Sequence, residues 1–226
     1  MKSNKNYTII RNVLKKSFFL KIKDNIDKII NRHIVSNKIK INTNLSIDLK
    51  LLILEELNHK HISELYNKFS KIKFYKKFIQ SKYLNNIIRS FLKIKNVESF
   101  TSIIRIDISN NKNWDLQFHQ EASYVKHKKS AFVWFPILNS NYSTNGGLKV
   151  IEKKISRHLP FKLITSPNAQ VQKKSIIPKK YLKYSKVINL NLGDILIFDK
   201  YLIHSSVIND TYRAKLSAVS SFVSND

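Results

Sequence analysis

The chain has 226 residues, of which 42% are hydrophobic, and it carries a formal net charge of +26. This length suits one large domain or a domain with a helical extension, and the absence of cysteine excludes disulfides, thiolate metal sites and cysteine nucleophiles. No run of about 18 apolar residues is present, so no transmembrane helix is expected, and the N-terminus lacks a signal-peptide core, which favours a cytoplasmic protein.

Residues 1–98 combine apolar side chains at helical spacing with many lysines, which predicts a mostly helical region that packs on the rest of the chain. Asn44 or Ser46 is the candidate cap of the second helix. His59 and His61 form an H-x-H, which could bind a metal, but a solvated turn beside Lys60 is the favoured interpretation. The expected helices cover 7–34, 44–57, 62–78 and 83–94.

From residue 99 the pattern changes to short apolar runs separated by Asn, Ser, Gly and Pro, which is typical of strands. About eight strands without long helices between them predict a double-stranded β-helix, or jelly roll, for residues 99–226. The fold class is therefore mainly β with α, a jelly-roll core with flanking N-terminal helices. The expected strands cover 101–107, 114–119, 130–138, 148–152, 162–165, 186–190, 195–199 and 215–223.

The stretch His119-Gln120-Glu121 carries the clearest chemical signal. On an extended strand, side chains at i and i+2 point to the same face, so the imidazole and the carboxylate converge. They would supply two ligands of a 2-His-1-carboxylate triad, which holds non-haem Fe(II) and leaves coordination positions open. A strand that leaves a turn at Gly193 could deliver His204 to the same face as the third ligand.

Arg213 follows His204 by nine residues and begins the last expected strand. A guanidinium grips a carboxylate through two parallel hydrogen bonds and stays charged. It therefore suits a dicarboxylate whose other end chelates iron through a carboxylate and a ketone. That ligand is 2-oxoglutarate.

Over residues 100–222, the chain resembles the phytanoyl-CoA dioxygenase-like family of Fe(II)- and 2-oxoglutarate-dependent oxygenases. The resemblance implies iron at His119, Glu121 and His204, 2-oxoglutarate on Arg213, and Trp134 in the pocket wall. The motifs that carry it are Arg105-Ile106-Asp107, His119-Gln120-Glu121, Trp134-Phe135-Pro136-Ile137-Leu138, Asn145-Gly146-Gly147-Leu148-Lys149-Val150, Ser156-Arg157-His158, and Gly193-Asp194 followed by His204 and Arg213.

The chain departs from the family pattern at two places. The family usually has Asp where this chain has Glu121, and the retained carboxylate favours hydroxylation over halogenation. The segment 154–158 differs from the usual Pro-Gly-Ser-His, which leaves the choice of substrate open.

The predicted function is therefore hydroxylation of a small or carrier-linked substrate, with O₂ and 2-oxoglutarate as cosubstrates. The alternative is a non-catalytic jelly-roll protein that binds an anionic ligand or surface. Lys126, His127, Lys128 and Lys129 would form a basic rim for an anionic substrate or, alternatively, a solvated loop.

The positive charge supports two interpretations, contact with an anionic partner and compositional bias. Lysines outnumber arginines 35 to 6, and the charge is spread, with 22 basic and 7 acidic residues in 1–98 and 19 and 8 in 99–226. Because Arg is the better reader of phosphates and no recognition motif is present, bias is favoured and nucleic acid is not the expected partner.

Overall fold

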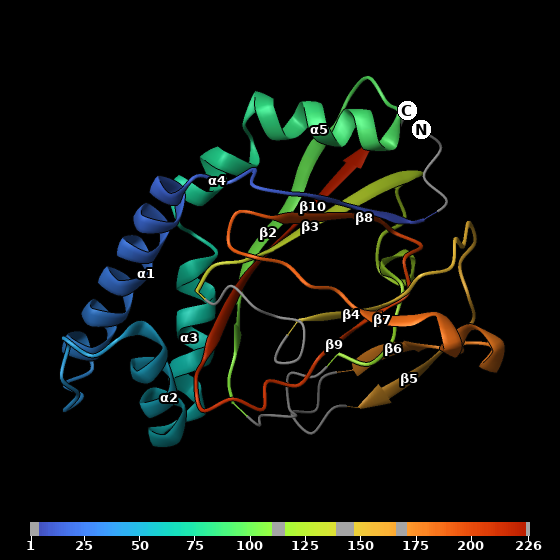
Figure 1. The fold of residues 1–226 in the computed structure, drawn as a ribbon. Helices are drawn as coiled ribbons and strands as arrows, with labels where there is room; N and C mark the ends of the chain where they lie inside the picture. The colour runs from blue at the N-terminus through green and yellow to red at the C-terminus, as the bar shows by residue number, and fades with distance from the viewer. Residues whose placement is uncertain (1–4, 110–115, 139–146, 166–170, 225–226) are drawn as a thin grey trace.

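The computed structural model describes residues 5–109, 116–138, 147–165 and 171–224 (Figure 1). The described chain begins with a short strand and a run of helices, and continues with strands and two short 3₁₀ turns. The first group is β1 (Tyr7–Ile10), α1 (Lys16–Ser36), α2 (Ile47–Leu57), α3 (His59–Phe69), α4 (Lys73–Ile79) and α5 (Lys82–Leu92). No helix in the described residues is long and apolar enough to cross a membrane.

The remaining elements are β2 (Glu98–Asp107), η2 (Glu121–Ser123), β3 (Lys129–Pro136), β4 (Leu148–Ile151), β5 (Phe161–Thr165), β6 (Val171–Ser175), η3 (Lys179–Tyr184), β7 (Ser185–Val187), β8 (Ile195–Asp199), β9 (His204–Ser206) and β10 (Lys215–Ser224). They form a five-stranded sheet in the order β1-β8-β3-β10-β2, a three-stranded sheet β7-β4-β9, and the hairpin β5-β6. All the pairs are antiparallel.

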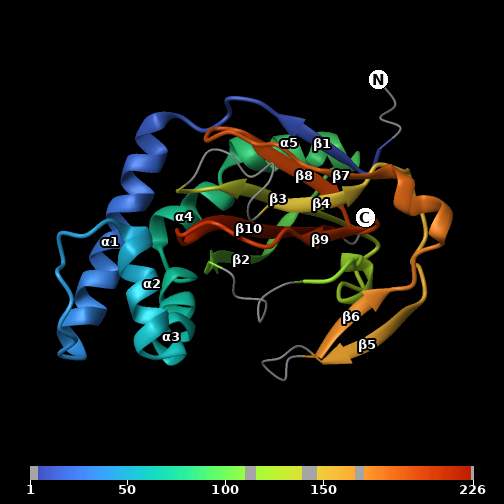
Figure 2. The ribbon, with the colours of Figure 1, turned by 60° about the horizontal axis from the view of Figure 1, so that its bottom comes forward.

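Helices cover one face of the five-stranded sheet, as both ribbon views show (Figure 1, Figure 2). Side chains on a strand alternate between its two faces. Val133, Ile197 and Ala218 point to the helices and share one core with Ile26 of α1 and Leu65 of α3.

The other face of the same sheet carries Phe132, Trp134, Leu196 and Phe198, which pack with Val150 of the smaller sheet. Two sheets packed over an apolar core, with helices behind the larger one, make the sheet-rich jelly-roll-like architecture that the strand pattern predicted.

Local helical order follows from ordinary capping and burial. Along α1, Ile22, Ile26 and Ile30 recur every four residues and are all fully buried. The Ser81 hydroxyl caps α5 by accepting a hydrogen bond from the Leu84 backbone N–H at 3.3 Å. At its other end, α5 stops at Lys93, whose φ of 55° lies in the left-handed region.

Several predicted boundaries are wrong. The helix expected over 7–34 is the strand β1 followed by α1, because residues 7–10 pair with β8 at the sheet edge. The helix expected over 62–78 is divided between α3 and α4. His61 lies within α3 and not in a turn, and its Nδ1 is 3.1 Å from Nε2 of the buried His33.

The strand expected over 186–190 corresponds to the shorter β7. The strands β6 and β9 were not predicted. The segment 114–119 begins outside the described residues, and its described part forms no strand, only a bridge at His119. The Asn145-Gly146-Gly147 part of the family motif also lies mostly outside the described residues, which resume at 147.

Candidate metal centre and adjoining cavity

His119 and His204 lie opposite each other on two antiparallel segments. The His119 N–H donates to the His204 carbonyl at 2.9 Å, and the His204 N–H donates to the His119 carbonyl at 3.0 Å. Directly opposed residues project their side chains to the same face. The two imidazole centroids are accordingly 4.2 Å apart.

Glu121 joins them because Gln120 keeps the backbone extended for one more residue before η2 begins. Gln120 has φ −119° and ψ 138°, so the side chains before and after it point to the same side. The Glu121 Oε1 lies 3.7 Å from Nε2 of His119 and 3.5 Å from Nε2 of His204. Glu121 thus reaches the two histidines from the first residue of a 3₁₀ turn and not, as expected, from a strand.

Gln120 itself points the opposite way and is fully buried. Its amide N–H donates to the carbonyls of Tyr201 at 2.7 Å and Arg157 at 3.2 Å. Its amide oxygen accepts from the Leu159 N–H at 2.8 Å. The bond to Tyr201 ties the turn that carries Glu121 to the segment that leads into His204, and the other two tie it to residues 157–159.

Both histidines are oriented by backbone carbonyls. Nδ1 of His119 lies 2.8 Å from the Gln117 carbonyl, and Nδ1 of His204 lies 3.2 Å from the Leu202 carbonyl. A carbonyl can only accept, so each Nδ1 donates a proton to it, and each Nε2 is the nitrogen that faces Glu121 and could bind a metal.

The electrostatics also suit metal binding. Burial alone would raise the pKa of Glu121, but the His119 and His204 rings hold it well below its usual range. Burial and the charge of His119 lower the pKa of His204, against the opposing effect of Glu121. An ionised carboxylate and a neutral imidazole are the protonation states that metal ligands require.

Among the described residues, His119, Glu121 and His204 are the group whose potential ligand atoms gather most closely, all within 4.8 Å of one another. Two imidazole nitrogens and one carboxylate oxygen match the donor set of a facial triad. The residues present therefore fit a divalent first-row metal such as iron.

A cavity of about 110 Å³ adjoins the three residues. Trp134 lies in its wall, as the resemblance implied, and most of the remaining lining is apolar. The lining residues other than the triad are Ile103, Arg105, Leu116, Trp134, Leu148, Phe198, Ser206 and Val219.

Arg213 does not line this cavity. Its side chain is 69% exposed, and its guanidinium lies 3.5 Å from the Asp48 carboxylate of α2. Arg105 of β2 does line the cavity and is only 18% exposed. The sequence contained a signal for the position of Arg105. It lies two residues after Ile103 on a predicted strand, and residues two apart on a strand point to the same face.

Two further polar residues share that face. On β10, Val219 lies opposite Ile103 and Trp134, and Ser217 lies opposite Arg105. Alternation places Lys215 on the same face as Ser217. The Lys215 side chain is buried, which lowers its pKa against the effect of Asp210 and Asp107.

Ser217 carries a buried hydroxyl that has no hydrogen-bond partner within the part of the chain that the structure describes. A buried polar group without a partner is costly, and it marks a place where a bound ligand can supply one. Arg105 therefore places a cationic donor in the cavity wall, and Ser217 and Lys215 follow on the same face of the sheet farther along β10.

The comparisons with known proteins support the fold. No family model matches the sequence, and no curated protein sequence matches it. Solved structures do match over almost the whole chain. The non-heme monooxygenase ThoJ has a TM-score of 0.65 at 12% identity, covering 98% of this chain and 75% of ThoJ.

EvdO2 from Micromonospora carbonacea var. aurantiaca has a TM-score of 0.67 at 12% identity, covering 97% of this chain and 86% of that protein. The epimerase SnoN, solved with Fe³⁺, alpha ketoglutarate and nogalamycin RO, has a TM-score of 0.63 at 10% identity, covering 97% and 79%. This chain therefore shares the fold of ThoJ, EvdO2 and SnoN.

Proposed function

We propose that this protein is a non-haem Fe(II)- and 2-oxoglutarate-dependent oxygenase. The observation that carries the proposal is the convergence of His119, Glu121 and His204, with both histidines presenting Nε2, inside a jelly-roll-like fold. Among proteins of the same fold, SnoN is solved with Fe³⁺ and alpha ketoglutarate, and EvdO2 with 2-oxoglutarate.

His119, Glu121 and His204 would hold the iron and leave one side of it open toward the cavity. Iron and 2-oxoglutarate together supply the activation of O₂ that lets an unreactive C–H bond be oxidised. The chain's own contribution is geometric. Gln120 fixes the turn that carries Glu121, and the carbonyls of Gln117 and Leu202 fix the two rings.

The small cavity suits 2-oxoglutarate, with Trp134 as one wall and the distal carboxylate of the keto acid directed toward Arg105, beyond which Ser217 and Lys215 lie on the same face of the sheet. This placement would give the Ser217 hydroxyl a partner. Arg213, the anchor expected from the sequence, is exposed beside Asp48, so we propose Arg105 and Lys215 in its place.

A larger cavity of about 400 Å³ shares Ile103, Arg105 and Leu116 with the small one and suits the substrate. Tyr66 and Asn67 of α3 supply its outer wall. Since most of the lining is apolar, the proposed substrate is a small molecule with an apolar body, held free or on a carrier.

The reaction that the retained carboxylate favours is hydroxylation. Epimerisation, the reaction for which SnoN is named, is the second candidate reaction. Membership of the phytanoyl-CoA dioxygenase-like family and location in the cytoplasm stay predictions from the sequence.

The test is anaerobic addition of 2-oxoglutarate to the Fe(II)-loaded protein, followed by admission of air. Chelation of iron by the keto acid is expected to produce a visible charge-transfer absorption band, and air is expected to yield succinate. If iron binds stoichiometrically and neither the band nor succinate forms, the chain is not an oxygenase. The alternative, a jelly-roll protein that only binds an anionic ligand, would then stand.

A further inference from the structure

A cleft of about 840 Å³ lies on the opposite side of the five-stranded sheet from the metal centre. Thr8 and Ile10 of β1 and Lys129 of β3 line it, together with α5 and residues 199–201. Alternation gives these strand residues the helix-facing side, whereas Trp134 and Phe198 point to the metal cavity. In both ribbon views β1 runs beside α5 (Figure 1, Figure 2).

The cleft is richer in lysine than the chain as a whole. Six of its seventeen lining residues are lysines, against 35 of 226 in the sequence, and Asp199 is the sole acid among them. The six are Lys5, Lys93, Lys128, Lys129, Lys154 and Lys200.

Two of these ammonium groups are held in place by the backbone. Lys129 Nζ donates to the Lys93 carbonyl at 3.3 Å, and Lys200 Nζ donates to the His127 carbonyl at 2.5 Å. Lys200 is also buried. An ammonium has three N–H donors, so each of these groups retains donors for an anion without first losing the freedom of a surface lysine.

The Asp199 carboxylate already has hydrogen-bond partners within the protein. It accepts a hydrogen bond from the Asn6 amide at 2.8 Å and one from the Tyr201 backbone N–H at 2.8 Å. Lys5 is paired with Glu152 at 2.9 Å, so the cationic surface that could meet an anion is centred on Lys128, Lys129 and Lys200.

The other wall of the cleft is apolar and aromatic. Tyr83, Ile87 and Phe91 recur every four residues along α5 and so form one stripe. Tyr83 is 55% exposed, which leaves its ring accessible for stacking. A ligand that satisfies both walls has an anionic end and a planar or apolar body.

We propose that this cleft binds a small molecule that carries a pyrophosphate group, with its phosphates at Lys128, Lys129 and Lys200 and its organic body along Tyr83. Phosphate suits an array of ammonium groups because each oxygen accepts several charged hydrogen bonds. The sequence left open whether residues 126–129 form a basic rim for an anionic substrate or a solvated loop, and in this proposal Lys128 and Lys129 belong to a separate site.

Calorimetric titration of the iron-loaded protein with ADP, coenzyme A, inorganic pyrophosphate and sulfate, at constant ionic strength, tests the proposal. ADP or coenzyme A is expected to bind at one site per chain, and sulfate only weakly. The double variant Lys128→Gln, Lys129→Gln should weaken that binding about tenfold or more, since it removes two charged hydrogen-bond donors to the phosphates.

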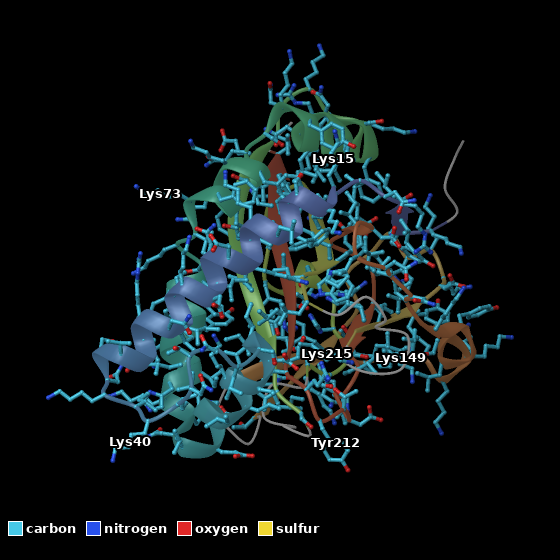
Figure 3. All side chains as sticks on the ribbon, turned by 60° about the vertical axis from the view of Figure 1, so that its left-hand side comes forward. Lys15, Lys40, Lys73, Lys149, Tyr212 and Lys215 are labelled. Carbon is cyan, nitrogen blue, oxygen red and sulfur yellow. The ribbon has the colours of Figure 1, made fainter. Side chains whose placement is uncertain are left out.

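The matched control is the double variant Lys40→Gln, Lys73→Gln, which removes the same charge from two exposed lysines on the helical layer (Figure 3). It should leave the affinity within about threefold of the parent, as expected for distant surface charges. Equal weakening by both double variants would reduce the effect to non-specific attraction and overturn the proposal.

Tyr83→Ala separates the two walls. It is expected to weaken ADP or coenzyme A binding and to leave pyrophosphate binding unchanged. If no organic phosphate binds more tightly than pyrophosphate, the proposed role of the α5 wall fails. Since these titrations read binding and not turnover, their result is independent of the oxygenase proposal.

Discussion

At the residue scale, the metal centre depends on a single backbone choice at Gln120. Its extended conformation puts the side chains of His119 and Glu121 on one side. Its own side-chain amide points to the other side, where it forms hydrogen bonds with the backbone of Tyr201, Arg157 and Leu159. The H-x-E spacing was readable from the sequence because it needs only local extension. The 3₁₀ turn that starts at Glu121 was not, because a tertiary bond from the Ala122 N–H to the Lys200 carbonyl holds it at 2.9 Å.

Glu121→Gln tests the carboxylate as a ligand. The substitution keeps the size and removes the negative charge that would balance Fe(II) beside two neutral imidazoles. Iron affinity is expected to fall by more than about tenfold, since even changes to residues that only orient ligands cost about 10–100-fold. Equilibrium Fe(II) titration measures this. The control is Glu98→Gln at the exposed start of β2, and parent-like iron binding by the Glu121 variant would exclude the triad.

Arg105, Lys215 and Arg213 differ in how they are expected to affect 2-oxoglutarate. Arg105→Lys keeps the charge but loses the two-pronged geometry, and Lys215→Met removes a buried cation, so each should weaken 2-oxoglutarate binding about tenfold or more. Arg213→Gln, on the exposed surface, should leave it unchanged. Titration of the charge-transfer band at fixed iron gives the three affinities. Loss only in the Arg213 variant would restore the anchor expected from the sequence.

The residue that would bind the distal carboxylate of 2-oxoglutarate was hard to predict from the sequence. Arg213 lies nine residues after His204 and suits a carboxylate, but the segment 207–214 forms no strand and carries it to the surface beside α2. Lys215 and Ser217 belong to a strand whose partners, Asp107 and Arg105, lie more than a hundred residues earlier. Which polar residues line the cavity was therefore decided by strand pairing, which local patterns do not specify.

At the element scale, β1 illustrates a similar ambiguity. Residues 7–10 are apolar enough for either a helix or a strand, and their pairing with β8 settles the choice. Two hydrogen bonds just after β1 stabilise this pairing. The Val13 and Leu14 N–H groups donate to the Gly193 carbonyl at 2.7 and 3.0 Å. Gly193 has φ +108°, a backbone conformation that favours glycine, which explains one of the three glycines in the chain.

Asp194 beside this junction gives a prediction about pH. Its burial raises the pKa, but the N–H groups of Asn191 and Asn12 and the Arg11 guanidinium outweigh burial and lower it below the usual value. A carboxyl with a depressed pKa stabilises the fold above its unfolded pKa of about 3.9, and the stabilisation is lost as the pH falls through the lower folded value.

Asp194→Asn should therefore lower the free energy of unfolding near pH 7, by about 1–3 kcal/mol as for other buried charged hydrogen bonds. The difference from the parent should shrink as the pH falls below about 4. Urea denaturation at pH 7, 5 and 3 measures both quantities. A difference that stays constant across this range would show that the Asp194 charge contributes nothing to the junction.

At the scale of the whole molecule, the five-stranded sheet separates two functional sides. The metal cavity opens on the face that meets the smaller sheet, and the helices and the cationic cleft occupy the other. Runs of strand-like and helix-like pattern were sufficient to predict this class of architecture. The order β1-β8-β3-β10-β2 was not predictable in the same way, because its neighbours are joined by long-range contacts across the chain.

The net charge of +26 predicts how the whole molecule responds to salt. Few carboxylates are available to balance the positive charge, 15 against 41 basic residues, and lysines such as Lys15, Lys40 and Lys73 lie on different parts of the molecule (Figure 3). Self-repulsion of a highly charged chain destabilises its compact state, and added salt screens it over about 10 Å at 0.1 M. Raising sodium chloride from low to moderate concentration should therefore increase the thermal midpoint at pH 7. In a protein stabilised mainly by surface ion pairs, the same addition would lower it. Thermal unfolding followed by circular dichroism across a chloride series measures the direction.

The variant Lys40→Glu, Lys73→Glu lowers the net charge by four and should reduce the slope of the midpoint against salt. An unchanged or steeper slope would show that long-range repulsion does not limit the stability of this fold.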